Sequence, residues 1–172
     1  MKQKNKMATK KKFKPKAFES TGVSSDVSAN IYNSMIFSNA WNDLTKNQRL
    51  LYLYCKSCYY GQKTLYKKSL FKDMGMNIPN EVRPFFSLTE GTIKNYWKLY
   101  TNVNSFYSDR DALISHGFIR VVADGHTMRK ANIYQFSNKW QRYGTKDFKI
   151  ENKEMSTSLR RKEEKLKRLS QN

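Results

Sequence analysis

The sequence predicts a small, mainly helical α+β domain with basic ends. Apolar residues recur at helical spacing in three segments, 45–60, 90–100 and 105–116. Two short β-prone runs follow at 118–122 and 132–136, and basic residues gather at both termini. A chain of 172 residues suits one domain plus tails. We expect a disordered arm at 1–29, the domain at 30–143, and a basic tail at 144–172 that is helical in part.

The charge of the chain indicates a polyanionic partner. Lys and Arg number 33 against 14 Asp and Glu, which gives a formal net charge of +19. Such an imbalance favours nucleic acid over an anionic membrane surface. Residues 1–16 hold eight lysines and no acid, and a basic arm gains affinity through counterion release. Lys10, Lys11 and Lys12 are therefore candidate DNA contacts, although the alternative is that the lysine-rich ends only keep the chain soluble.

The first half of the domain contains the strongest helix signals. Ser38 is the expected N-cap of a short helix that carries Ala40, Trp41 and Leu44. Thr45 and Gln48 form a capping box in front of a core helix that ends at Gly61. The residues at helical spacing in that helix are Leu50, Leu51, Tyr54, Cys55 and Cys58.

The middle of the chain is harder to interpret. Residues 62–88 contain two of the three prolines and predict a loop with a short helical turn and a strand near Phe85–Ser87. Thr89 is the expected cap of a helix over residues 90–100, which places Ile93, Tyr96, Trp97 and Tyr100 on one face. A core face is favoured for these aromatic residues over stacking on single-stranded bases.

A polar helix and a basic hairpin follow. The helix is expected over Ser105–His116, with Asn104 as N-cap and Gly117 just after its end. Asp124 and Gly125 predict a turn after the first β-prone run, in a long loop. A short closing helix starts at residues 137–140, and Leu159, Leu166 and Leu169 lie on one side of a helix in the tail.

The order helix, helix, turn, helix, strand, basic turn, strand predicts a winged helix-turn-helix with a two- or three-stranded wing sheet. A helix that enters the major groove must be apolar behind and polar in front. Phe106 and Leu113 are expected to face the core, and the stem of Arg110 to pack while its guanidinium reaches outward. The candidate DNA contacts are Asn102, Asn104, Ser105, Tyr107, Ser108, Arg110 and Asp111 on the helix, and His126, Arg129 and Lys130 on the wing.

Three stretches, "MIFSNAWNDLTKNQRLLYLY", "SFYSDRDALISHGFI" and "NIYQFSNKWQRYG", resemble winged helix-turn-helix proteins of plasmids, phages and integrative conjugative elements of Gram-positive bacteria. The resemblance covers roughly residues 31–143. It implies binding at an origin, as in replication initiators and in accessory proteins of the conjugative DNA-processing complex.

The sequence favours no catalytic, metal or cofactor site. Cys55 and Cys58 form a CxxC pair well inside a helix, which favours core packing over redox chemistry or zinc binding. The two histidines, His116 and His126, do not fit the spacing of a zinc finger. Tyr59, Tyr60 and Tyr107 are conceivable nicking nucleophiles, but packing or stacking is favoured for them. We expect a non-enzymatic protein without metal or cofactor.

The leading hypothesis is a sequence-specific, double-stranded DNA-binding protein of a mobile element. It would bind at or near an origin of transfer as an accessory to a relaxase, in the cytoplasm and without a membrane partner. The alternatives are a replication initiator, a transcriptional repressor, or a scaffold protein whose C-terminal helix binds a partner. An initiator often carries a second winged domain, and this chain has room for only one, which favours an accessory role or function as a homodimer.

Overall fold

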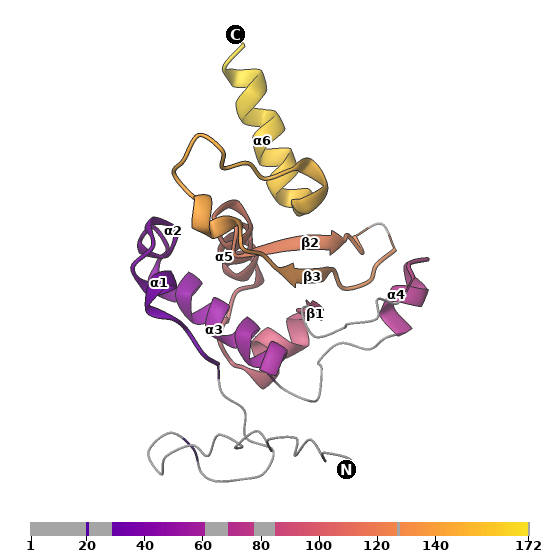
Figure 1. Cartoon of the computed structure of the whole chain (residues 1–172). Coiled ribbons are helices and arrows are strands. Elements are labelled where there is room, and N and C mark those ends of the chain that lie inside the picture. The colour runs from indigo at the N-terminus through magenta and orange to yellow at the C-terminus, as the bar shows by residue number, and fades with distance from the viewer. Residues whose placement is uncertain (1–19, 21–28, 61–68, 78–84, 127, 172) are drawn as a thin grey trace, which may run out of the picture.

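The computed structural model describes residues 20, 29–60, 69–77, 85–126 and 128–171 (Figure 1). The expected α+β class is confirmed, because helices combine with a three-stranded antiparallel sheet in the order β1-β3-β2. Its strands are β1 (Phe85–Ser87), β2 (Ile119–Ala123) and β3 (Ile133–Phe136). The predicted strand near Phe85–Ser87 is thus real, and it pairs with β3. Lys10, Lys11 and Lys12 and the expected helix stop at Gly61 lie outside the described residues.

The N-terminal helices begin where the capping residues predict. These helices are α1 (Asn33–Ile36), α2 (Asn39–Asn42) and α3 (Lys46–Tyr60). The Ser38 side chain accepts a hydrogen bond from the backbone N–H of Trp41 at 3.2 Å. Thr45 and Gln48 exchange backbone-to-side-chain hydrogen bonds at 2.9 and 3.3 Å, so the capping box is confirmed.

The core lies where α3 and α5 (Val103–Ser115) meet each other and the sheet. Leu51, Cys55 and Leu113 are fully buried there. Trp41, Tyr52 and Phe118 form a cluster of edge-on and tilted rings with centroids 5.1 to 5.9 Å apart. Leu50 was expected in the apolar stripe of α3 but is 40% exposed, whereas its neighbour Tyr52 is buried.

The helix expected over residues 90–100 is wrong in its extent. The chain forms only a short π-helical turn, η1 (Thr92–Tyr96), and Lys98 then takes a positive φ of 53°. Ile93 and Tyr100 are buried as expected, but Tyr96 is 75% exposed. The reversal at Lys98 separates residues that a continuous helix would have kept on one face.

α5 begins two residues earlier than the sequence predicts. Asn102, and not Asn104, is the N-cap, and its side chain accepts a hydrogen bond from the backbone N–H of Asn104 at 2.8 Å. At the other end Gly117 occupies the expected position with a φ of +78°. The backbone N–H of Phe118 donates to Leu113 and that of Gly117 to Ile114, which is a Schellman motif. A Cβ on Gly117 would lie 2.7 Å from the backbone nitrogen of Trp140, so this turn requires glycine.

β2 and β3 are joined by the hairpin loop, residues 124–132. The side chains of Asp124 and Asn132 accept backbone N–H bonds from His126 and Gly125, respectively, which order the turn predicted there. A short helix, α4 (Ser69–Asp73), lies beyond the tip of this hairpin in Figure 1, and Lys130 approaches Asp73 at 3.8 Å.

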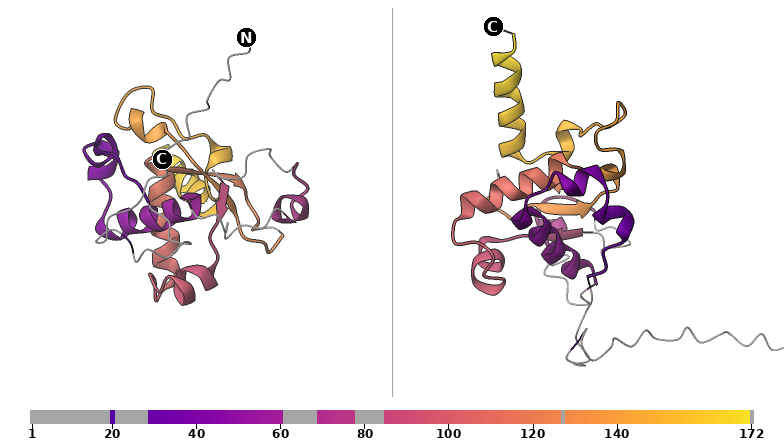
Figure 2. Two further views of the ribbon diagram at one scale, coloured as in Figure 1. Left: turned by 60° about the horizontal axis from the view of Figure 1, so that its bottom comes forward. Right: turned by 90° about the vertical axis from the view of Figure 1, so that its left-hand side faces the viewer.

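The packed structure continues past residue 143, where the tail was expected to begin. Two short 3₁₀ turns, η2 (Lys139–Arg142) and η3 (Asn152–Glu154), lead to α6 (Thr157–Leu169). Glu154, Met155 and Ser156 are buried. The predicted helix in the tail is therefore present, and its first turn belongs to the domain. The rest of α6 stands away from the domain (Figure 2).

Candidate nucleic-acid interface

The first half of α5 exposes a neutral, polar surface. The exposed residues at this end are Asn102, Asn104, Ser105, Tyr107 and Ser108. On the opposite side of the helix, Phe106 and Leu113 are buried, as the sequence predicts. Small polar side chains in front of an apolar back are suited to contact the edges of bases.

Two other candidate contacts on α5 face inward. Arg110 is 6% exposed and Asp111 is 3% exposed, so the predicted outward positions of the Arg110 guanidinium and the Asp111 carboxylate are wrong. They were missed because their partners lie far along the chain. The Arg110 guanidinium donates to Asp111 at 2.7 Å and to the phenol oxygen of Tyr134 at 3.4 Å.

This buried pair anchors the start of α6. The Asp111 carboxylate accepts the Ser156 hydroxyl at 2.6 Å and the Ser158 hydroxyl at 2.7 Å. Ser158 in turn accepts from Arg110 at 2.7 Å. Burial opposes the charged form of Arg110, but the neighbouring Tyr134 and Asp111 raise the pKa of its guanidinium. The guanidinium and the carboxylate thus both have hydrogen-bond partners within one network that joins α5, β3 and α6.

A second acidic residue of α5, Asp109, also has its hydrogen-bond partners within the domain. Asp109 accepts hydrogen bonds from Gln48 at 3.2 Å and from the Tyr100 hydroxyl at 2.8 Å. Burial and this contact with Asp109 raise the pKa of Tyr100. Asp109 and Asp111 are therefore engaged within the domain, and the exposed surface of α5 is left to neutral side chains.

The hairpin loop also contacts the start of α6. Asp124 accepts hydrogen bonds from the Thr157 hydroxyl and, at 2.9 Å, from Arg160. Burial alone would raise the pKa of Asp124, but the hydrogen bonds from Thr157 and from the His126 backbone, together with the charge of Arg160, hold it below its ordinary value. The loop and α6 are thereby tied together by a charged side chain.

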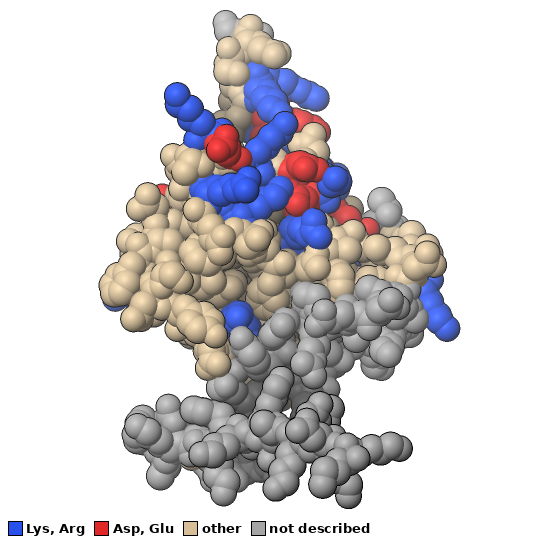
Figure 3. Space-filling model, viewed as in Figure 1, with Lys and Arg blue, Asp and Glu red and all other residues tan. Residues whose placement is uncertain are grey.

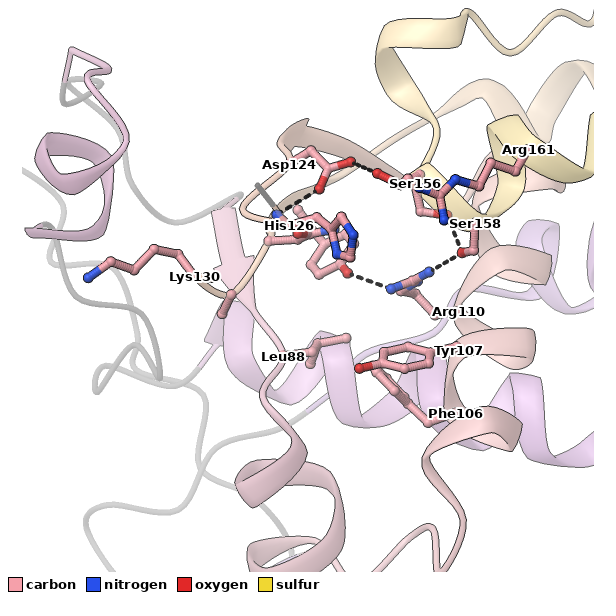
Figure 4. Close-up of a pocket in the computed structure, with 14 residues that line it drawn as sticks. Leu88, Phe106, Tyr107, Arg110, Asp124, His126, Lys130, Ser156, Ser158 and Arg161 are labelled. Atoms are coloured by element: carbon pink, nitrogen blue, oxygen red, sulfur yellow. Dashed lines mark hydrogen bonds between the residues drawn. The ribbon is translucent and has the colours of Figure 1, made fainter. Parts of the chain in front are cut away.

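A pocket of about 310 Å³ lies between α5, the hairpin loop and the first turn of α6 (Figure 4). We call it the α5–α6 pocket. Phe106, Leu88 and Tyr134 are among the residues that line it. Tyr107 lies at its α5 side with its ring 4.9 Å from the Arg110 guanidinium carbon. The nitrogen-bearing side chains that line it are Arg110, His126, Lys130, Asn132 and Arg161.

The three predicted wing residues have different positions. All three are exposed. His126 and Lys130 are among the residues that line the α5–α6 pocket, although the Lys130 side chain points away from it (Figure 4), and Arg129 takes a positive φ of 53°. The ion pair of Lys130 with Asp73 is long, at 3.8 Å, and both side chains are nearly half exposed. Such a pair contributes little, so Lys130 is available to a stronger anion.

α6 carries much of the visible positive charge. Figure 3 shows Lys and Arg side chains gathered over the upper part of the molecule, around α6, with Asp and Glu among them. Of these residues only Arg161 reaches the α5–α6 pocket. The basic tail that the sequence indicates is thus in part a helix, whose first turn contacts Arg110 and Asp111 of α5.

Cys55 and Cys58 are buried and unpaired in the core, as the packing interpretation predicts. Burial raises the pKa of both thiols, that of Cys58 to about 12. Elsewhere in the part of the chain that the structure describes, no cluster of three or more His, Cys, Asp or Glu side chains is arranged to hold a metal ion.

Within the described ranges, no helix has the length and apolar character needed to cross a membrane. The comparisons with known proteins add no relative, because no family model, curated protein or solved structure matches this chain.

Proposed function

We propose that this chain is a winged helix-turn-helix protein that binds double-stranded DNA. The order of elements supports the proposal. After α3 come α4, β1, the η1 turn, α5, β2, a basic loop and β3, and the part from η1 to β3 has the order turn, helix, strand, loop, strand that such a domain requires. In this assignment α5 is the reading helix and the hairpin loop is the wing.

The observation that carries the proposal is the position of the α5–α6 pocket. It brings His126 of the wing and Arg161 of α6 together with Tyr107 on the exposed half of α5, while the Lys130 side chain starts at the pocket and points away from it (Figure 4). This arrangement is complementary to a DNA duplex, because the neutral base edges in a groove are bordered by negatively charged phosphates. The formal charge of +19 adds attraction that does not depend on sequence.

The exposure of each side chain determines the role that we propose for it. Asn104 and Ser108 face the base edges, where an Asn side chain can pair bidentately with adenine. Arg129 and Lys130 contact the phosphates beside the groove. Arg110 and Asp111 hold α6 in place and do not touch DNA, because both are buried.

The biological process rests on the resemblance to proteins of Gram-positive mobile elements. We propose an accessory protein that binds at or near an origin of transfer and helps a relaxase. Initiation of replication and repression of transcription use the same chemistry and differ only in the site that is bound.

Selection of bound sequences from random duplex DNA tests the proposal. We expect enrichment of one motif, and its positions in the genome of the element identify the process. A motif at the transfer origin supports the accessory role, and one at a promoter supports repression. If the full chain enriches no motif and retains no duplex, the proposed function is wrong.

A further inference from the structure

Three basic residues of α6 lie on one face of the helix. Arg161, Lys165 and Arg168 are spaced by four and three residues, which brings them into line along a helix. All three are exposed. Because Arg161 lines the α5–α6 pocket, this basic stripe starts at the pocket and runs outward along α6.

The stripe differs from Arg160 and Lys162, two other basic residues of α6, in its partners. Arg160 contacts Asp124 at 2.9 Å, and Lys162 approaches Asp111 at 3.9 Å. No ion pair joins the stripe to any residue that the structure describes. Three aligned charges are therefore left for an external anion.

The direction of α6 is fixed by its first turn. Ser156 caps the helix by accepting the backbone N–H of Leu159 at 3.2 Å, and its hydroxyl donates to the buried Asp111. Thr157 and Arg160 bind Asp124 of the hairpin loop. Contacts to α5 and to the loop thus hold one end of α6, while the C-terminal part of the helix projects into solvent (Figure 2).

We propose that the basic stripe is a second DNA-contacting element, which follows the phosphate backbone next to the segment that α5 reads. This inference rests on the proposed function. The stripe from Arg161 to Arg168 spans about 10 Å along α6, which corresponds to about three base pairs. The anchored first turn sets where this backbone segment lies relative to the groove that α5 occupies.

The exposed leucines of α6 are the main argument for another partner. Leu166 and Leu169 are 65% and 64% exposed and would suit a protein surface. A second copy of the chain fits poorly, because α6 is short and holds six basic residues against two acidic ones, so two such helices repel. The stripe is continuous with the proposed DNA surface, which favours the phosphate backbone.

The test compares two variants that each lose three positive charges. The stripe variant is Arg161→Gln, Lys165→Gln and Arg168→Gln. The control variant is Lys146→Gln, Lys149→Gln and Lys167→Gln, all at exposed positions outside the stripe. Each full-length protein is titrated with the selected duplex, and with the same duplex extended by six base pairs at either end, over a range of salt concentrations.

We expect the wild type and the control to bind the extended duplex more tightly than the short one. The stripe variant should gain nothing from the extension, and its salt slope should fall by about 2 to 3, since each phosphate contact contributes about 0.9. Equal salt slopes for the two variants would overturn the proposal that the stripe contacts the phosphate backbone, while leaving the proposed function intact. If the wild type binds no duplex, the proposed function itself fails.

Discussion

The Asp111 carboxylate accepts the Ser156 hydroxyl at 2.6 Å, across 45 residues of chain. A buried residue of α5 therefore determines where α6 begins. The same carboxylate neutralises Arg110, so its loss would leave a buried guanidinium without a counter-charge.

We predict that Asp111→Asn lowers the free energy of unfolding by about 3 kcal/mol, in the range for breaking a buried ion pair. Asp147→Asn, at an exposed position, is the control and should change it by less than about 0.5 kcal/mol. Urea unfolding measures both values. Trypsin should also cleave the folded Asp111→Asn protein faster within α6, and equal stability of both variants would contradict the anchor.

Local signals in the sequence predicted most of the fold. Ser38, Thr45 and Gly117 act through hydrogen bonds or backbone angles that involve their near neighbours, so their roles can be inferred from a few residues. The cap of α5 was misplaced from Asn102 to Asn104 because both are asparagines two residues apart, and spacing alone does not distinguish them.

The inward-facing charges could not be predicted in this way. Asp111 binds Ser156 and Ser158, and Asp109 binds Gln48, at separations of 45 to 61 residues. A charged residue on a polar helix is ordinarily exposed, and only the folded chain brings these partners together. The serines before "LRRKEE" are a recognisable N-cap signal for α6, but not a signal for what anchors it.

Specific binding is expected to depend on Asn104. Asn104→Ala should reduce the preference for the selected site over a scrambled duplex by about 1–3 kcal/mol and leave non-specific binding nearly unchanged. Asn138→Ala is a matched control, because Asn138 is exposed and its side chain makes no capping bond. Competition binding at fixed salt gives the ratio. If both variants keep the wild-type ratio of binding to the selected and the scrambled duplex, Asn104 does not contribute to sequence recognition.

The wing is expected to contribute affinity without specificity. Arg129→Gln with Lys130→Gln should weaken binding to all duplexes alike and lower the salt slope by about 1 to 2. Gln is preferred to Gly at 129 because it leaves the strain of the positive φ unchanged. The slope is measured against Lys146→Gln with Lys149→Gln. If both double variants show the same salt slope, the hairpin loop does not contact the phosphate backbone of the DNA.

The cysteines should behave as core residues. Since burial raises the pKa of both thiols, Cys55 and Cys58 should react with a thiol reagent in the folded protein far more slowly than after unfolding. Replacing both by Ala should lower thermal stability modestly and leave DNA binding intact. Release of a stoichiometric metal on unfolding of the wild type, absent in the double variant, would contradict simple packing.

The buried Glu154 should make stability depend on acid pH. Burial alone would raise the pKa of Glu154, but hydrogen bonds from Lys139 and the Glu151 backbone and the contact with Arg120 hold it below the ordinary value of 4.5. The charged form is therefore favoured by folding, and its contribution is complete above pH 4.5 and is lost as the pH falls through the lowered pKa.

Glu154→Gln should accordingly destabilise the domain by about 1–3 kcal/mol at pH 7, as expected for a buried charged partner that is lost. The difference from wild type should shrink as the pH falls below 4.5. Glu164→Gln, on the exposed surface of α6, is the control and should show neither effect. Urea unfolding at pH 7, 5 and 3 measures the trend. A difference that stays constant down to pH 3 would mean that the charge of the Glu154 carboxylate is not what stabilises the domain.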